Sequence, residues 1–162
     1  MIFSLFSTIT GVKATNSPAI GSKAPTPKSI THEGKPFDFA EAYTKGLTLV
    51  FFYPKADTPG CTKQACSLRD EYEKLQDLGI QVIGVSKDTP QDQAKFREKY
   101  HLPYTLIADK DGKVIEAFGT GSMIGMSKRR AFLIKDGSVV WLDLNASTSK
   151  QAQDVLNYMA KK

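Results

Sequence analysis

The chain has 162 residues, enough for one domain that buries most of its apolar surface without the support of disulfides or metals. Hydrophobic residues make up 41% and charged residues 24%, and no apolar run reaches the length of about 18 residues that a membrane-spanning helix needs. The net charge of +5 is modest, and no nucleic-acid-reading motif surrounds its densest basic patch, residues 128–130. We therefore expect neither a nucleic-acid partner nor a membrane partner.

The N-terminus allows two interpretations. Residues 2–12 are moderately apolar, and Val12-Lys13-Ala14 resembles the small-residue cleavage site of an export signal. However, no Lys or Arg precedes the apolar run, and Ser and Thr dilute it. We predict a flexible leader over residues 1–20, a domain over residues 21–162, and a cytoplasmic location. The alternative is an exported, periplasmic protein in which residues 1–14 act as the signal.

The first predicted elements alternate between strand and helix. Residues 47–53, "LTLVFFY", form a continuous apolar run, which is typical of a strand buried on both faces. Residues 62–78 carry apolar side chains at helical spacing, and Gly79 can end that helix. A second buried strand is predicted over residues 80–86, and a helix capped by Asp88 or Thr89 over residues 90–100.

The second half of the chain is predicted to contain more strands. A strand over residues 104–109 is followed by the turn "KDGK" and a further strand in "VIEAFG", residues 114–119. Residues 130–135 and 139–144 read as a hairpin, and residues 148–160 as an amphipathic helix. This order predicts an α/β fold in which helices flank a central mixed β-sheet on both faces.

Both cysteines of the chain, Cys61 and Cys66, lie in the stretch "PKADTPGCTKQAC", just after the first predicted strand. The Pro-Gly pair before Cys61 turns the chain into a helix, so Cys61 lies in a first turn whose free N–H groups and dipole favour a thiolate. Thr58 can offer a hydroxyl to the same pocket, and Pro54 can shield it from water. These residues predict a nucleophilic Cys61 that attacks a small, oxygen-bearing electrophile.

The spacing of the two cysteines sets a geometric limit. Residues five apart in an α-helix are separated by roughly 8–9 Å between Cα atoms and by about 140° around the axis. A disulfide needs Cα atoms less than about 7 Å apart. Either the pair of Cys61 and Cys66 never bonds, or the helix unwinds during a reaction cycle.

The stretch "FFYPKADTPGCTKQACSLRDEY" resembles the active-site segment of the peroxiredoxins, in particular the bacterioferritin comigratory protein, or PrxQ, subfamily. The similarity extends from residue 21 through "IGVSKD", "FREKYHLPYTLIAD" and "FLIKDG". The Pro-x-x-x-Thr-x-x-Cys pattern of Pro54, Thr58 and Cys61 is specific to this superfamily, and a second cysteine five residues later is typical of the subfamily. The resemblance implies a thioredoxin-like fold.

The resemblance also implies a peroxidase cycle on hydrogen peroxide and organic hydroperoxides. Cys61 would become a sulfenic acid, Cys66 would condense with it to an intramolecular disulfide, and thioredoxin or a similar dithiol would reduce that bond. An arginine completes the pocket in the family, and Arg129 has the matching position, while Arg130 is expected to point the other way. Two features depart from the family pattern: Ala131 replaces a hydroxyl residue, and the segment before Arg129 is short.

Other sites and functions are weighed against this one. His32 and His101 have no ligand spacing with the cysteines, so we predict no metal and no cofactor. We expect a monomer, with a weak isologous dimer as the alternative. A thiol–disulfide oxidoreductase of the same fold would need a Cys-x-x-Cys motif, which the sequence lacks. A redox-sensing or chaperone-like binding module, which exposes a surface when the helix unfolds, would bind a partner in an oxidation-dependent way, without peroxide turnover.

Overall fold

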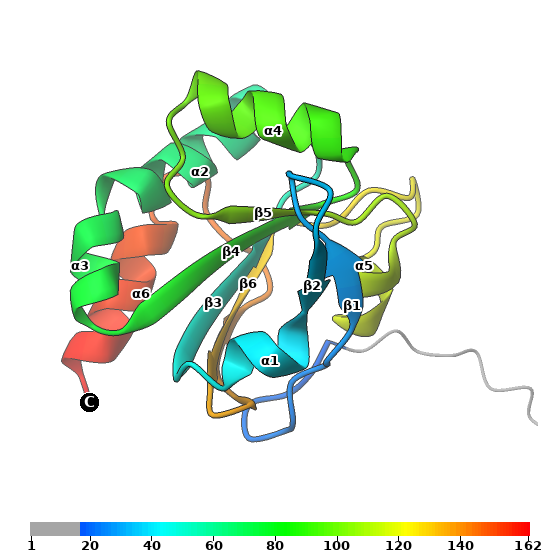
Figure 1. Ribbon diagram of the computed structural model, residues 1–162. Helices are drawn as coiled ribbons and strands as arrows, with labels where there is room; N and C mark the ends of the chain where they lie inside the picture. The colour runs from blue at the N-terminus through cyan, green and yellow to red at the C-terminus, as the bar shows by residue number, and fades with distance from the viewer. Residues whose placement is uncertain (1–16) are drawn as a thin grey trace, which may run out of the picture.

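The computed structural model describes residues 17–162 and is built around a five-stranded mixed sheet in the order β5-β4-β3-β6-β7 (Figure 1). β3 pairs in parallel with β4, and β4 with β5, whereas β6 and β7 run antiparallel to their neighbours. A separate two-stranded antiparallel sheet joins β1 to β2. The strands are β1 (Lys28–Ile30), β2 (Pro36–Asp38), β3 (Leu47–Phe52), β4 (Ile80–Ser86), β5 (Thr105–Ala108), β6 (Arg130–Lys135) and β7 (Ser138–Asp143).

Helices cover both faces of the large sheet, which confirms the predicted fold class. One face carries α2 (Pro59–Asp70), α3 (Tyr72–Asp77), α4 (Pro90–Lys99) and α6 (Gln151–Ala160), whose buried side chains share one core cluster. The other face carries α1 (Phe39–Tyr43) and α5 (Lys113–Ala117), whose buried side chains belong to a second cluster. The sheet therefore separates two apolar layers.

β3 shows why the sequence pattern of this strand was continuous rather than alternating. Leu49 and Phe51 belong to the first core cluster, whereas Val50 and Phe52 belong to the second. All four side chains are fully buried. Because successive side chains of a strand point to opposite faces, a strand covered on both sides presents apolar side chains to both core clusters.

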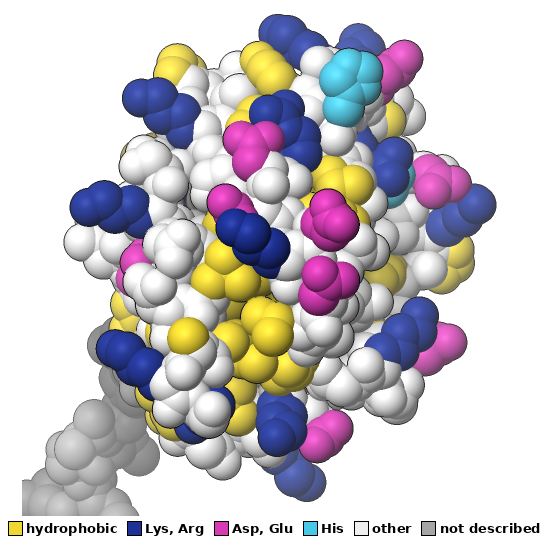
Figure 2. Space-filling model, turned by 90° about the vertical axis from the view of Figure 1, so that its left-hand side faces the viewer, with side chains coloured by type: hydrophobic (Ala, Val, Ile, Leu, Met, Phe, Trp, Pro, Cys, Tyr) yellow, Lys and Arg dark blue, Asp and Glu magenta, His cyan; other side chains and the backbone are white. Residues whose placement is uncertain are grey.

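The first core cluster reaches the molecular surface on the side where α3 and α6 lie. Figure 2 shows hydrophobic side chains gathered in the middle of this face, with charged side chains of both signs around them. Partly buried hydrophobic residues that pack against the cluster include Tyr72, Trp141, Leu156, Tyr158 and Met159.

Over residues 17–162, we find no helix of the length and hydropathy that a membrane span requires.

The prediction of a strand over residues 114–119 is wrong. Helix α5 covers Lys113–Ala117, and so includes the first four residues of that segment. The Asp109 carboxylate accepts hydrogen bonds from the backbone N–H groups of Val114 (3.0 Å) and Ile115 (2.8 Å), which caps the first turn. Gly112, at a φ of 74°, turns the chain into the helix. The free edge of β5, where a hairpin partner would lie, is met instead by Thr31, which bridges to Ile107.

The predicted helix over residues 62–78 is instead two helices. α2 begins earlier, at Pro59, and Glu71 separates it from α3 with φ and ψ of −103° and 10°. Gly79 follows α3 at a φ of 75° and donates to Gln76 O, as expected of a residue that ends a helix. The apolar spacing continues across Glu71 because both helices pack on the same core cluster.

The remaining strand and helix predictions are largely confirmed. The hairpin of β6 and β7 is present, Thr89 caps α4 by accepting from Asp92 N (3.2 Å), and α6 begins at Gln151 rather than at residue 148. The sequence analysis missed β1, β2 and α1, which are short. Of the predicted leader over residues 1–20, residues 1–16 lie outside the described part of the chain.

Candidate active site

Cys61 lies at the carboxyl end of β3, where the sheet order changes direction between β4 on one side and β6 on the other. It is the third residue of α2, after Pro59 and Gly60, and its side chain is 1% exposed. The helical ladder begins with Thr62 N donating to Thr58 O (2.9 Å), which leaves the Cys61 N–H without a helical acceptor. The thiol therefore lies in a nearly closed, donor-rich first turn.

The guanidinium of Arg129 lies beside this thiol. Its Nη2 is 3.6 Å from Cys61 Sγ, and its Nη1 donates to Gln64 Oε1. Arg129 comes just before β6, whose first residue pairs with Phe52 at the end of β3, so sheet register brings the arginine to the cysteine turn. Ala146 N donates to the Arg129 carbonyl (3.1 Å) and holds its backbone.

Arg130 points away from the cysteine, as the alternation of a strand requires. Its Nη1 donates to the Ser17 hydroxyl (2.7 Å) and to the Gly119 carbonyl (3.0 Å). Ala131 is fully buried in the core cluster that also contains Cys61. Ala131 has no hydroxyl to offer, and the Arg129 guanidinium contacts the side chains of Cys61 and Gln64.

Gln64 and Gln151 extend the site into the core, and the sequence analysis missed both. An arginine can only donate, so Gln64 Oε1 must face Arg129 and Gln64 Nε2 must face away. Gln64 Nε2 then donates to Gln151 Oε1 (2.8 Å) at the start of α6. Both glutamines are fully buried. A polar residue three positions after Cys61, on the same side of the helix, was the available sequence signal for Gln64.

Gly60 is required by close packing rather than by backbone freedom. A Cβ atom at this position would lie 3.0 Å from Arg129 Nη2 and 3.3 Å from Thr148 Cγ2. Thr148 belongs to the loop between β7 and α6. Three separate segments thus meet at the cysteine turn, and a Cβ atom on Gly60 would require the Arg129 guanidinium to shift by a few tenths of an ångström.

Thr58 and Pro54 flank the cysteine turn. Thr58 is the N-cap of α2, and its side chain makes no capping bond; its hydroxyl instead donates to Lys55 O (2.7 Å). The hydroxyl proton therefore points to the Lys55 carbonyl, and the lone pairs of the hydroxyl oxygen remain able to accept a hydrogen bond. Pro54 is half-buried directly after Tyr53, whose N–H donates to Val85 O (3.1 Å).

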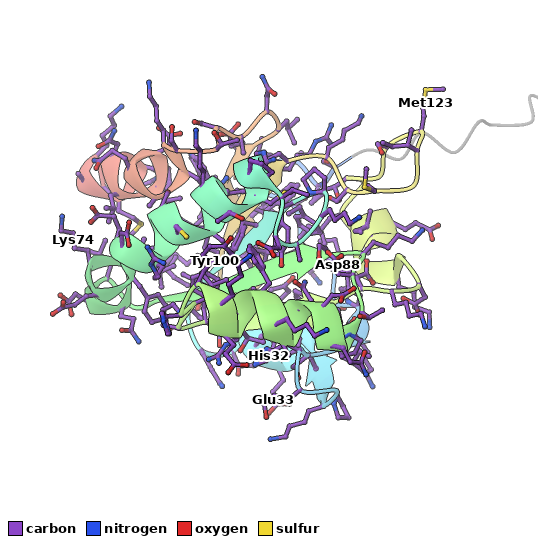
Figure 3. The ribbon with its side chains drawn as sticks, turned by 90° about the horizontal axis from the view of Figure 1, so that it is seen from above. His32, Glu33, Lys74, Asp88, Tyr100 and Met123 are labelled. Carbon is purple, nitrogen blue, oxygen red and sulfur yellow. The ribbon has the colours of Figure 1, made fainter. Side chains whose placement is uncertain are left out.

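The loop between β3 and α2 is held from two sides. Asp57, at a φ of 59°, accepts hydrogen bonds from Lys99 Nζ (2.9 and 3.1 Å) and Tyr100 Oη (2.7 Å), which together lower the pKa of its carboxyl. Ala56 N donates to Asp88 Oδ2 (2.8 Å). Figure 3 shows Tyr100 between α4 and α2 and Asp88 toward the other end of α4. These contacts fix the loop that positions Thr58.

Cys66 lies one and a half turns further along α2 and is half-buried. Burial raises the pKa of its thiol, against the opposing charge of Arg69. Both cysteines are free thiols, and the helix that carries them is intact. In this state their separation follows helix geometry, roughly 8–9 Å between Cα atoms, which is too far for a disulfide.

The rest of the described chain offers little metal-binding chemistry. Between residues 17 and 162 there is no group of three or more His, Cys, Asp and Glu side chains that could hold a metal ion. A cavity of about 620 Å³ lies between the loop at residues 55–57 and α4, and Cys61 and Arg129 are not among its lining residues.

The amino-acid sequence of the chain is similar to those of known proteins. A family model described as "AhpC/TSA family" matches residues 20–142. Peroxiredoxin Bcp of Escherichia coli is 43% identical over 119 residues, which cover 68% of this chain and 76% of that protein. The chloroplastic peroxiredoxin Q of Sedum lineare is 38% identical over 129 residues, covering 76% of this chain and 69% of that protein.

Solved structures agree with the sequence relatives. The crystal structure of peroxidoxin BcpB from Mycobacterium tuberculosis superposes with a TM-score of 0.82 at 29% identity, covering 89% of this chain and 97% of that one. The fold and the sequence thus point to the same group of proteins.

Proposed function

The chain belongs to the AhpC/TSA family, among the Bcp and Q peroxiredoxins, and we propose that it works through a Cys61 sulfenic acid and a Cys61–Cys66 disulfide. Peroxiredoxins are thiol peroxidases, so this protein is an oxidoreductase that reduces peroxides at the expense of a dithiol. It has the thioredoxin-like fold of its structural neighbours.

The observation that carries the first step is the Arg129 guanidinium 3.6 Å from Cys61 Sγ, at the start of a helix. The Cys61 thiolate attacks one peroxide oxygen, the O–O bond breaks, and the leaving oxygen takes a proton to become water or an alcohol. Arg129 and the free N–H groups of the first turn stabilise the negative charge on sulfur and on the peroxide oxygens. The Thr58 oxygen accepts a hydrogen bond from the peroxide hydroxyl.

The second step requires α2 to open. The Cys66 thiol attacks the sulfenic sulfur of Cys61, a disulfide forms and water leaves. Burial raises the pKa of the Cys66 thiol while the helix is folded, so Cys66 becomes a better nucleophile once the helix unwinds and water reaches it. We propose that thioredoxin, or a similar dithiol protein, reduces the disulfide and lets α2 refold.

Cysteine variants test this cycle. Cys61→Ser is expected to lose essentially all peroxide consumption, because serine cannot form a sulfenic acid. Cys66→Ser, given one equivalent of peroxide, is expected to consume it and to hold Cys61 as the sulfenic acid, because no resolving thiol is present. Mass spectrometry of the wild type after one equivalent of peroxide should find a Cys61–Cys66 disulfide.

The reductant is tested by coupling peroxide consumption to thioredoxin, thioredoxin reductase and NADPH. The wild type is expected to turn over, and both cysteine variants are expected to stay at background. Undiminished turnover by Cys61→Ser would refute the assigned nucleophile, and full turnover by Cys66→Ser would refute its resolving role. Rapid reduction of protein disulfides without peroxide consumption would favour a thiol–disulfide oxidoreductase instead.

A further inference from the structure

A tyrosine from outside α2 holds the part of the helix that lies between the two cysteines. The hydroxyl of Tyr104 donates a hydrogen bond of 2.6 Å to the carbonyl oxygen of Ala65. Ala65 is fully buried and lies between Cys61 and Cys66, whereas Tyr104 comes just before β5. A helical carbonyl already accepts from the N–H four residues later, so this bond is an additional, tertiary tie on the helix backbone.

The position of Tyr104 is well defined. Its ring packs edge-on against Phe51, with centroids 5.6 Å apart at 86°, and is tilted against Tyr72 at 5.9 Å. The side chain is 2% exposed, and burial raises the pKa of its hydroxyl well above the usual value. The hydroxyl therefore stays protonated and remains a donor at neutral pH.

Other residues of α2 also make tertiary contacts, but breaking those contacts would affect parts of the molecule other than the segment between the cysteines. Leu68 is buried, and Arg69 Nη1 donates to Tyr100 O (2.7 Å), so the end of the helix is tied to α4 beyond the cysteines. Gln64, one residue before Ala65, accepts a hydrogen bond from Arg129, so replacing Gln64 would also disturb the arginine beside Cys61. The Tyr104 hydroxyl, in contrast, donates to the helix backbone at Ala65.

We propose that the Tyr104 hydroxyl is a latch that keeps residues 61–67 helical and so determines how Cys61 sulfenic acid is partitioned between two fates. The proposal rests on the cycle proposed above, and Tyr104 acts in it as a positioning residue. In one fate, the helix opens, the Cys66 thiol attacks, and a disulfide and water form. In the other, the helix stays closed and a second peroxide oxidises the sulfenic acid to a sulfinic acid, releasing water or an alcohol.

The Tyr104 hydrogen bond raises the free energy needed to open residues 61–67. Opening the segment breaks the bond between Tyr104 and Ala65 and exposes both groups to water. Removing the hydroxyl is expected to raise the open population about fivefold, which corresponds to a net hydrogen bond of about 1 kcal/mol. Disulfide formation should then be about fivefold faster, and about fivefold more peroxide should be needed for the same sulfinic yield.

The test compares Tyr104→Phe with Tyr43→Phe. Tyr43 is also buried and also donates a 2.6 Å hydrogen bond to a carbonyl, that of Pro25, but it lies in the core cluster on the other face of the sheet. Both variants lose one buried tyrosine hydroxyl and keep the ring. Rapid mixing with peroxide, acid quenching, alkylation and mass spectrometry would give the rates of sulfenic, disulfide and sulfinic formation for each protein.

Tyr104→Phe is expected to leave the first oxidation of Cys61 within about twofold of the wild type and to shift the partition about fivefold toward the disulfide. Hydrogen exchange of the reduced protein should be faster in residues 61–67, and Tyr43→Phe should change neither quantity. An unchanged partition and exchange rate in Tyr104→Phe, or equal changes in Tyr43→Phe, would overturn the latch. A wild type that forms no Cys61–Cys66 disulfide would instead refute the proposed function, and the latch with it.

Discussion

Replacing Arg129 with lysine tests whether the geometry of its guanidinium, rather than its charge, activates Cys61. The arginine uses Nη1 for Gln64 and Nη2 for the sulfur. The single ammonium of a lysine cannot occupy both positions, so Arg129→Lys loses one charge-assisted hydrogen bond. Such a bond contributes about 1.5–3 kcal/mol, which corresponds to a rate about 10–150-fold lower.

The assay is the second-order rate constant of the reduced protein with hydrogen peroxide, followed by stopped flow or as kcat/KM. Arg130→Lys is the matched control, because Arg130 has the same charge and the adjacent position but bonds Ser17 and Gly119. We expect the control to stay within about twofold of the wild type. An Arg129→Lys rate within about threefold of the wild type, or equal losses in the two variants, would refute the reasoning.

Three further predictions concern packing and pH. Gly60→Ala should lower kcat/KM by at least about tenfold, because the new Cβ would lie 3.0 Å from Arg129 Nη2; wild-type activity would show that the guanidinium can move without consequence. Gly84→Ala should lower the free energy of unfolding by about 1–3 kcal/mol, since its Cβ would lie 2.7 Å from Phe51 Cζ, and a thermal melt with an unchanged Tm would contradict this. Burial lowers the pKa of His32 below the ordinary value of 6.5, so the unfolded chain binds more protons and stability should fall as the pH falls below about 6.5. Urea unfolding midpoints measured at about pH 7.5 and about pH 5.5 check this pH dependence. The His32→Gln variant should lose less stability than the wild type between these two pH values, and an equal loss would show that His32 is not its source.

The misassigned segment at residues 114–119 illustrates a limit of local pattern. Its β-branched and aromatic residues suit a strand, and a turn precedes them. The helix forms because the Asp109 carboxylate, at the end of β5, accepts the N–H groups of Val114 and Ile115. A carboxylate four residues before the first residue of a helix is not a sequence signal of capping, because its reach depends on how the chain turns at Gly112.

The sequence by itself determined the layered α/β fold and the helix that starts beside Cys61. Continuous apolar runs require strands that are covered on both faces, and the Pro-Gly pair ahead of Cys61 requires a helix that starts beside it. The spacing of Cys61 and Cys66 excluded a bond within that helix. Each of these inferences depends on residues that are close in the sequence.

The tertiary structure alone decided which distant side chains meet at that turn. Strand register brings Arg129 to Cys61, the packing of α6 on α2 brings Gln151 to Gln64, and the end of the loop before β5 brings Tyr104 to the carbonyl between the cysteines. These contacts join residues far apart in the chain, and a buried polar group finds its partner only when the core around it is packed. The placement of Cys61 at the start of a helix follows from the local sequence, whereas the side chains that surround its thiol are brought there by the fold.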